Sequence, residues 1–89
     1  MAEGRRATVV LFAALRDAAD TAAVEVDAPV RLDVLLGDLA DRFGPRFAER
    51  SRIAAVMVAG TPVDRDEDVT IPAGAEVALL PPFAGGATG

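Results

Sequence analysis

Residues 32–43, with the sequence LDVLLGDLADRF, constrain the fold of this 89-residue chain more than any other segment. Apolar side chains recur there at the spacing i, i+3, i+4, i+7 and i+11, which places them on one face of a helix. They are Leu32, Leu35, Leu36, Leu39 and Phe43. Asp33 in the first turn and Arg42 in the last turn agree with the helix dipole, and Gly44 followed by Pro45 ends the helix. The pattern predicts one main amphipathic helix whose apolar face packs against another layer.

Four other segments have the composition of strands. Residues 7–13 (ATVVLFA) are almost entirely apolar and predict a central strand, while residues 22–27 (AAVEVD) alternate apolar and acidic side chains, as a half-buried strand does. Residues 54–59 (AAVMVA) and 75–80 (AEVALL) are the other two. Residues 14–20 predict a short helical turn or connector, so we expect the first two strands to form a hairpin.

The segments between these elements are predicted to be connections. We expect residues 45–52 (PRFAERSR) to be an irregular linker that places Phe47 in the interior. Residues 60–62 (GTP) predict a turn, after which Val63 begins a short return strand. Residues 64–68 (DRDED) are expected to form an acidic loop exposed to solvent.

The resulting order is strand, strand, helix, strand, short strand, strand, with a short extended piece at residues 69–71. This order indicates an α+β domain in which one main helix lies across one mixed sheet. With the first and last strands adjacent and parallel, the arrangement is the β-grasp fold of ubiquitin-like proteins. The helix and the middle of the chain supply the long crossover that a parallel pair needs. We expect one domain at residues 1–80, followed by a flexible tail at residues 81–89 that contains a diglycine.

The ionisable side chains argue against several classes of function. The net charge is −5, so neither nucleic acid nor an anionic membrane finds a basic footprint. The chain has neither Cys nor His, which removes the thiol nucleophile and the commonest general base and metal ligand. We therefore expect no catalysis by this chain alone, no metal, no bound cofactor and no nucleic-acid partner.

Two segments imitate known motifs without satisfying them. An apolar run at residues 9–15 follows two arginines, as in a secretory signal, but it is far shorter than the roughly 20 residues that span a membrane. We interpret it as a buried strand, and we expect a cytoplasmic protein with no membrane partner. The acidic loop at residues 64–68 begins like a calcium loop, but the Gly and Glu that such a loop needs further on are missing.

The C-terminal segment carries the most specific motif. The predicted strand runs into Pro81-Pro82-Phe83-Ala84-Gly85-Gly86, that is, two prolines, an aromatic residue and a diglycine. Prolines keep the chain extended and cannot pair as a continuing strand, and glycines lack the Cβ that would block a narrow channel. Such a tail is suited to delivering a terminal carboxylate into the nucleotide site of another enzyme.

Three segments together resemble the MoaD family, the small subunits of molybdopterin synthase. They are VVLFAALRDAAD near the start, VMVAGTPVDRDEDV in the middle and AGAEVALLPPFAGG near the end. The resemblance covers residues 7–86, and its most specific part is the strand followed by two prolines and the diglycine. The ThiS carriers of thiamin synthesis are similar in fold and diglycine, but they are usually shorter and lack the proline segment.

The resemblance implies a sulfur carrier of molybdenum cofactor biosynthesis that has no enzymatic activity of its own. In that family a MoeB-like adenylyltransferase uses ATP and Mg²⁺ to convert the terminal glycine carboxylate to an acyl-adenylate. A sulfur donor then replaces AMP and leaves a thiocarboxylate. A MoaE-like large subunit accepts the tail and uses this sulfur to build the dithiolene of molybdopterin. ATP and Mg²⁺ therefore belong to the partner.

The resemblance also assigns roles within the tail. By position, the thiocarboxylate forms on Gly86, and Gly85 and Gly86 thread the channel of the partner. Pro82 belongs to the same channel-threading tail, and Phe83 anchors it. These four residues are therefore our candidates for the chemistry and its delivery.

The family's apolar docking patch corresponds in this chain to Phe12, Pro62 and Leu80. Strand alternation supports this assignment, because if Val9 and Leu11 face the core then Phe12 faces the opposite side. The same alternation in the last strand turns Leu80 outward. The alternative for Phe12 is an ordinary core aromatic residue.

The chain departs from the family pattern because Ala87-Thr88-Gly89 follow the diglycine, so Gly86 is held in a peptide bond. We expect a protease to remove residues 87–89, as happens with some carriers of cysteine and natural-product pathways. The alternatives are that these residues are not native, or that Gly89 is the reactive end. The sulfur acceptor could then belong to cysteine, thiamin or natural-product biosynthesis. Outside the sulfur carriers, the chain could be a ubiquitin-like protein modifier or an interaction module with an inert tail.

Overall fold

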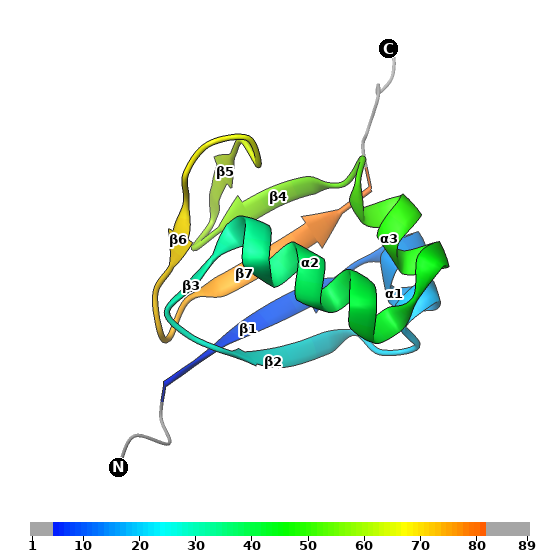
Figure 1. Ribbon diagram of the computed structural model, residues 1–89, viewed down its shortest axis with the longest axis horizontal. Helices are drawn as coiled ribbons and strands as arrows, with labels where there is room; N and C mark the ends of the chain where they lie inside the picture. Colours follow the sequence, from blue (N-terminus) through cyan, green and yellow to red (C-terminus); the bar gives the residue numbers. More distant parts are fainter. Residues whose placement is uncertain (1–4, 82–89) are drawn as a thin grey trace.

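The computed structural model describes residues 5–81 of the chain (Figure 1). Strands and helices follow one another with short connections. In chain order they are β1 (Arg6–Leu11), α1 (Ala13–Ala19), β2 (Ala23–Asp27), β3 (Val30–Arg31), α2 (Leu32–Phe43), α3 (Pro45–Ser51), β4 (Ala55–Val58), β5 (Thr61–Val63), β6 (Thr70–Ile71) and β7 (Glu76–Leu80).

The main sheet has five strands in the order β2-β1-β7-β4-β5. β1 and β7 are adjacent and parallel, with Val9 beside Val77, whereas β2, β4 and β5 are each antiparallel to their neighbours. The chain between β1 and β7 provides the long crossover that this parallel pair requires. The predicted mixed sheet and β-grasp fold are therefore confirmed, as is the hairpin of the first two strands.

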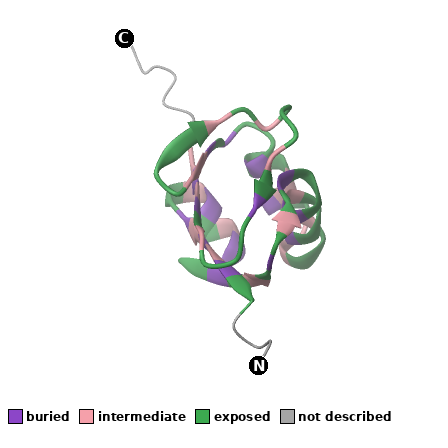
Figure 2. Cartoon of the chain, turned by 90° about the vertical axis from the view of Figure 1, so that its left-hand side faces the viewer, coloured by how far each residue is buried: buried purple, intermediate pink, exposed green. Residues whose placement is uncertain are grey.

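The three helices lie over one face of this sheet, which we call the inner face (Figures 1 and 2). Alternate strand residues point to that face, and Val9, Leu11, Val77 and Leu79 are each at most 2% exposed. Burying each such side chain contributes roughly 1.5–3 kcal/mol to folding. The opposite face of the sheet, which no helix of residues 5–81 covers, is called the outer face below.

The main helix α2 has the bounds that its periodicity predicts. Leu32, Leu35 and Leu39 are each 1% exposed and form the part of the core that faces the sheet. Leu36 and Phe43 are half-buried and pack at the margin of this core. Two short helices, α1 and α3, complete the helical layer beside this main one.

The prediction of an irregular linker at residues 45–52 is wrong, because Pro45–Ser51 form helix α3. Pro45 occupies the first turn, where its missing N–H costs no hydrogen bond. Phe47 is fully buried, as expected, and its ring centroid lies 5.2 Å from that of Phe43. Phe47 is the one large side chain that α3 buries, so the sequence of this helix shows no helical spacing of apolar residues.

The turn predicted at residues 60–62 is displaced by one to two positions. Ala59 and Gly60 form the turn, with φ angles of 51° and 82°, and β5 already begins at Thr61. Two central residues with positive φ give the turn whose twist matches that of an antiparallel hairpin. Pro62 consequently lies in β5, opposite Met57, at an edge of the sheet where proline is tolerated.

The predicted extended piece at residues 69–71 contains β6, which pairs with β3 in a separate two-stranded sheet. The helical turn predicted at residues 14–20 is α1, and Asp20 ends it with a left-handed φ of 60°. Among residues 5–81, no helix is long and apolar enough to span a membrane.

Candidate functional site

The candidate site lies at the C-terminal end of β7. β7 ends at Leu80, and Pro81 is the last residue that the structure describes. The tail residues to which we assign chemistry or channel entry, Pro82, Phe83, Gly85 and Gly86, lie outside the described residues. The structure therefore defines the surface around the root of the tail.

Three strands place apolar residues at this root. β1 runs parallel to β7, so Phe12 follows β1 at the same end, and its N–H donates to the Leu79 carbonyl at 3.3 Å. β4 begins at this end too, because Ala55 pairs with Leu80, and Ile53 lies two residues before it. Figure 1 shows the ends of β1 and β7 and the start of β4 on the same side.

Two of these residues are unusually open for their type. Phe12 is 42% exposed and Ile53 is 62% exposed, and they are two of the three large hydrophobic residues exposed within residues 5–81. Leu80 and Pro81 are half-buried. We call Phe12, Ile53, Leu80 and Pro81 the apolar collar.

An apolar row crosses the outer face of the sheet. Strand register places its members side by side on all five strands, in the order Ala23, Val10, Ala78, Met57 and Pro62. Residues that pair directly across strands project to the same face, so this row forms a continuous strip opposite the helices. It adds a flat apolar surface to the collar.

The outer face changes in character along the strands. At the end remote from the collar, Arg6 lies 3.4 Å from the carboxylate of Glu25 and 3.9 Å from that of Asp27. These three side chains are well exposed, so their pairing contributes about 0–1 kcal/mol to stability. The outer face therefore has a charged end and an apolar end, and Pro81 lies at the apolar end.

The three residues of the predicted docking patch share this outer face. Val10 of the row points outward, and the extended backbone of Phe12, with φ −122° and ψ 147°, continues the alternation. The exposed fraction of Phe12 shows that the core-aromatic alternative is wrong. Leu80 points outward because it alternates with the buried Leu79, and Pro62 points outward because it pairs with Met57 of the row. The two residues are separated by β4, with Pro62 on the edge strand β5 and level with Ala78.

Sequence reasoning missed two parts of this surface. Met57 alternates with Val56 and Val58 in β4, so the parity argument used for Phe12 could have found it. Ile53 is a single apolar residue in a connection, and no period in the sequence distinguishes it from a core residue. Its exposure is evident only from the packing of α3 and β4.

The described residues combine an apolar outer surface with an interior that is almost entirely apolar. Within residues 5–81, no group of three or more Asp, Glu, His or Cys side chains is placed to hold a metal ion. Over the described part of the chain, the buried residues are apolar except for Ser51, whose hydroxyl donates to the Ala48 carbonyl at 3.0 Å.

The sequence profile of the ThiS family matches residues 9–86. The match covers most of the chain and extends through the diglycine. No curated protein sequence is significantly similar to this chain.

Solved structures share the fold over nearly their whole length. Small archaeal modifier protein 1 of Haloferax volcanii is 25% identical, with a TM-score of 0.69, and the match covers 89% of this chain and 99% of that one. A putative molybdopterin converting factor subunit 1 of Pyrococcus furiosus is 20% identical, with a TM-score of 0.67 and coverages of 86% and 97%. In a complex of subunits 1 and 2 of the Helicobacter pylori molybdopterin-converting factor, the matching chain is 18% identical, with a TM-score of 0.64 and coverages of 94% and 97%.

Proposed function

This chain belongs to the ThiS family, and from that membership we propose that it carries sulfur as a thiocarboxylate on Gly86. The single observation that carries the proposal is the extent of the family match, which ends at the second glycine of the diglycine. The open apolar collar at the root of the tail supports it, because a partner that takes up the tail would cover that surface.

The chemistry needs no side chain of this protein. A Gly86 carboxylate oxygen attacks the α-phosphorus of ATP on an adenylating partner, and pyrophosphate leaves. A sulfur nucleophile then attacks the acyl carbon, and AMP leaves with the bonding electrons. Adenylation supplies the leaving group that a bare carboxylate lacks, and the partner holds ATP and Mg²⁺. The carrier contributes a free glycine terminus and a surface that orients it.

Gly86 must first become a terminus, since Ala87 follows it. We propose that a protease cleaves after Gly86 and removes residues 87–89. The proposal therefore includes three kinds of partner, namely a protease, a MoeB-like adenylyltransferase and an acceptor of the sulfur.

For the acceptor we propose a MoaE-like large subunit of molybdopterin synthase. The solved Helicobacter pylori protein, whose fold this chain shares, is in a complex with subunit 2 of the molybdopterin-converting factor. That likeness supports an assembly of the same kind here. Acceptors in cysteine, thiamin or natural-product biosynthesis are the alternatives, since some carriers of cysteine and natural-product pathways also lose a C-terminal extension.

A second candidate function is a ubiquitin-like protein modifier. The likeness to small archaeal modifier protein 1, at 25% identity over nearly all of both chains, favours it. A modifier would use the same acyl-adenylate, but a lysine amine of a target protein would attack the acyl carbon. AMP would leave with the bonding electrons, the amine would lose a proton, and an isopeptide bond would form. Covalent adducts of this chain on other proteins would identify that route.

Reconstitution in solution tests the sulfur-carrier proposal. We expect a chain that ends at Gly86, incubated with the adenylating enzyme, ATP, Mg²⁺ and sulfide, to exchange one oxygen for one sulfur in its intact mass. The full 89-residue chain should keep its mass unless the protease is added. Gly86→Ala in the shortened chain should block the exchange, because a Cβ obstructs the channel.

Gly37→Ala is the matched control for that substitution. Gly37 lies in α2, and a Cβ built there meets no atom within 4 Å. This variant should fold, gain up to about 1 kcal/mol of helix stability and exchange sulfur normally. Equal rates for Gly86→Ala and Gly37→Ala would contradict the assignment of Gly86.

A further inference from the structure

The two edges of the five-stranded sheet differ in their ability to accept another strand. β5 forms one edge, and Pro62 in its middle has no N–H to donate. β2 forms the other edge, and its sequence, AVEVD, contains no proline. The β2 edge is therefore the better template for strand addition.

The backbone of β2 leaves hydrogen-bonding groups free at this edge. Leu11 donates to the Ala22 carbonyl at 2.8 Å at one end of the β1–β2 pair, and Ala28 donates toward β1 at 3.2 Å at the other. In an antiparallel pair, alternate residues direct both their N–H and C=O groups to the neighbouring strand. Glu25 and Asp27 fall on the other positions, so their N–H and C=O groups point away from β1.

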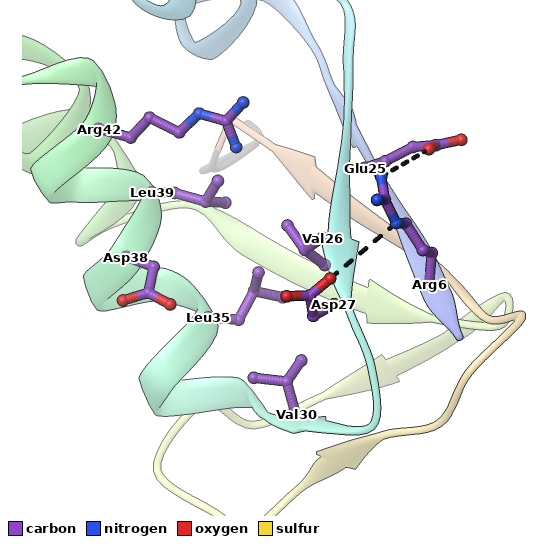
Figure 3. Close-up of a pocket in the computed structure, with 9 residues that line it drawn as sticks. All are labelled: Arg6, Glu25, Val26, Asp27, Val30, Leu35, Asp38, Leu39 and Arg42. Atoms are coloured by element: carbon purple, nitrogen blue, oxygen red, sulfur yellow. Dashed lines mark hydrogen bonds and ion pairs between the residues drawn. The ribbon is translucent and has the colours of Figure 1, made fainter. Parts of the chain in front are cut away.

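An open groove lies beside this edge, between β2 and α2. Its volume is about 290 Å³. Its apolar lining comes from Val26, Val30, Leu35 and Leu39, and its charged lining from Arg6, Glu25, Asp27, Asp38 and Arg42. Figure 3 shows the leucines projecting from α2 toward β2 and Val26 projecting back toward α2. A strand added to β2 would direct every second side chain into this groove.

The charges on the outer face of β2 favour particular side chains at the outward positions of an added strand. On the outer face, Glu25 and Asp27 are 64% and 99% exposed along their side chains, and Arg6 is their one cationic neighbour among the ion pairs within residues 5–81. Side chains directly across an antiparallel pair interact, and opposite charges there are stabilising. An added strand therefore fits best with basic side chains on its outward positions.

The same charges disfavour a second copy of this chain as the occupant. Two β2 edges paired antiparallel would bring the carboxylates of Glu25 and Asp27 of one copy against those of the other. Like charges directly opposite are destabilising in a sheet. The β2 edge therefore disfavours pairing with the β2 edge of a second copy and favours a strand with basic side chains.

We propose that the β2 edge and the adjoining groove bind an extended segment of a partner protein in which basic and aliphatic residues alternate. The segment adds a sixth strand to the sheet, with its aliphatic side chains against the half-buried Val26 and Val30 and its basic side chains beside Glu25 and Asp27. Asp27 pairs with Arg6 at the start of β1, the end remote from the tail. This site is therefore separate from the collar and independent of Gly86 chemistry.

Nuclear magnetic resonance titration of the full chain tests the proposal with three hexapeptides. They are Lys-Val-Lys-Val-Lys-Val, its acidic counterpart Glu-Val-Glu-Val-Glu-Val, and Lys-Lys-Lys-Val-Val-Val, which has the first peptide's composition without its alternation. We expect the alternating basic peptide to shift the amide signals of Glu25 and Asp27 and to slow their hydrogen exchange. Both other peptides should bind at least about tenfold more weakly.

Charge reversal on the edge provides the matched comparison. Glu25→Lys with Asp27→Lys should reverse the preference, so that the acidic alternating peptide binds more tightly than the basic one. Asp66→Lys with Glu67→Lys changes the net charge equally in an exposed loop away from β2, and should leave the preference unchanged. Retained amide spectra show that both variants fold.

Three results would overturn the proposal. The first is the absence of shifts at β2 at millimolar basic peptide. The second is equal binding of the alternating and block basic peptides, which would indicate attraction to net charge alone. The third is an equal loss of binding in the β2 and loop variants.

Discussion

The inner and outer faces of the central sheet are made by the same strands and serve different purposes. On β7, Val77 and Leu79 are fully buried under the helices, whereas Ala78 and Leu80 between and beyond them face the open side. The inner residues supply the apolar burial on which a small domain depends. The outer residues Ala78 and Leu80 are also apolar, but they are only half-buried. Strand parity thus separates the core residues of this strand from those on its open face.

The largest expected effect is a difference in the free energy of unfolding between alanine substitutions at two adjacent leucines, one on each face. Leu79→Ala removes a fully buried side chain and should lower the free energy of unfolding by about 3 kcal/mol. Leu80→Ala, one residue later on the outer face, should lower it by about 1 kcal/mol or less. Urea denaturation measures both variants, with one slope of unfolding free energy against urea concentration used for the two. Equal decreases in the free energy of unfolding would show that the two faces are not distinct.

An intermediate effect is expected for recognition at the collar. Phe12→Ala should weaken binding to the adenylating partner by about tenfold or more, because large aromatic residues often dominate interfaces. Val34→Ala is the control, since Val34 is 48% exposed but lies on α2, away from the outer face. Calorimetric titration measures both variants. A loss of affinity in the α2 variant as large as in the Phe12 variant would place the partner elsewhere.

The smallest expected effect is a gain in stability from a substitution in the turn of the β4–β5 hairpin. This hairpin places Met57 opposite Pro62 on the outer face. Ala59 adopts a φ of 51°, a conformation that costs a non-glycine residue roughly 1 kcal/mol and that asparagine tolerates better. Ala59→Asn should therefore raise the melting temperature by a few degrees, with about 0.5–1 kcal/mol of added stability. A lower melting temperature would mean that the turn is not of this type.

The residues of the inner face are easier to predict from the sequence than those of the outer face. Five apolar residues at helical spacing define α2 to the residue, because each contributes to one buried stripe. Alternation in the first and last strands likewise identifies Phe12 and Leu80 as outward. These features repeat at a fixed period, so a single sequence is enough to detect them.

The features that could not be predicted are short or depend on packing. Helix α3 has seven residues and one deep anchor, Phe47, so no apolar stripe can appear. β3 and β6 have two residues each, too few to show alternation. The exposure of Ile53 and the groove beside β2 arise from how separate elements meet. Neither is encoded in a local pattern.

The central claim is that the reactive group is the acyl carbon of Gly86, and the intact mass of the protein isolated from its native cells tests it most directly. The account predicts a species that ends at Gly86 and carries sulfur in place of one carboxylate oxygen. A protein that retains residues 87–89 throughout, with its carboxylate unchanged while the sulfur-acceptor pathway is active, would contradict it.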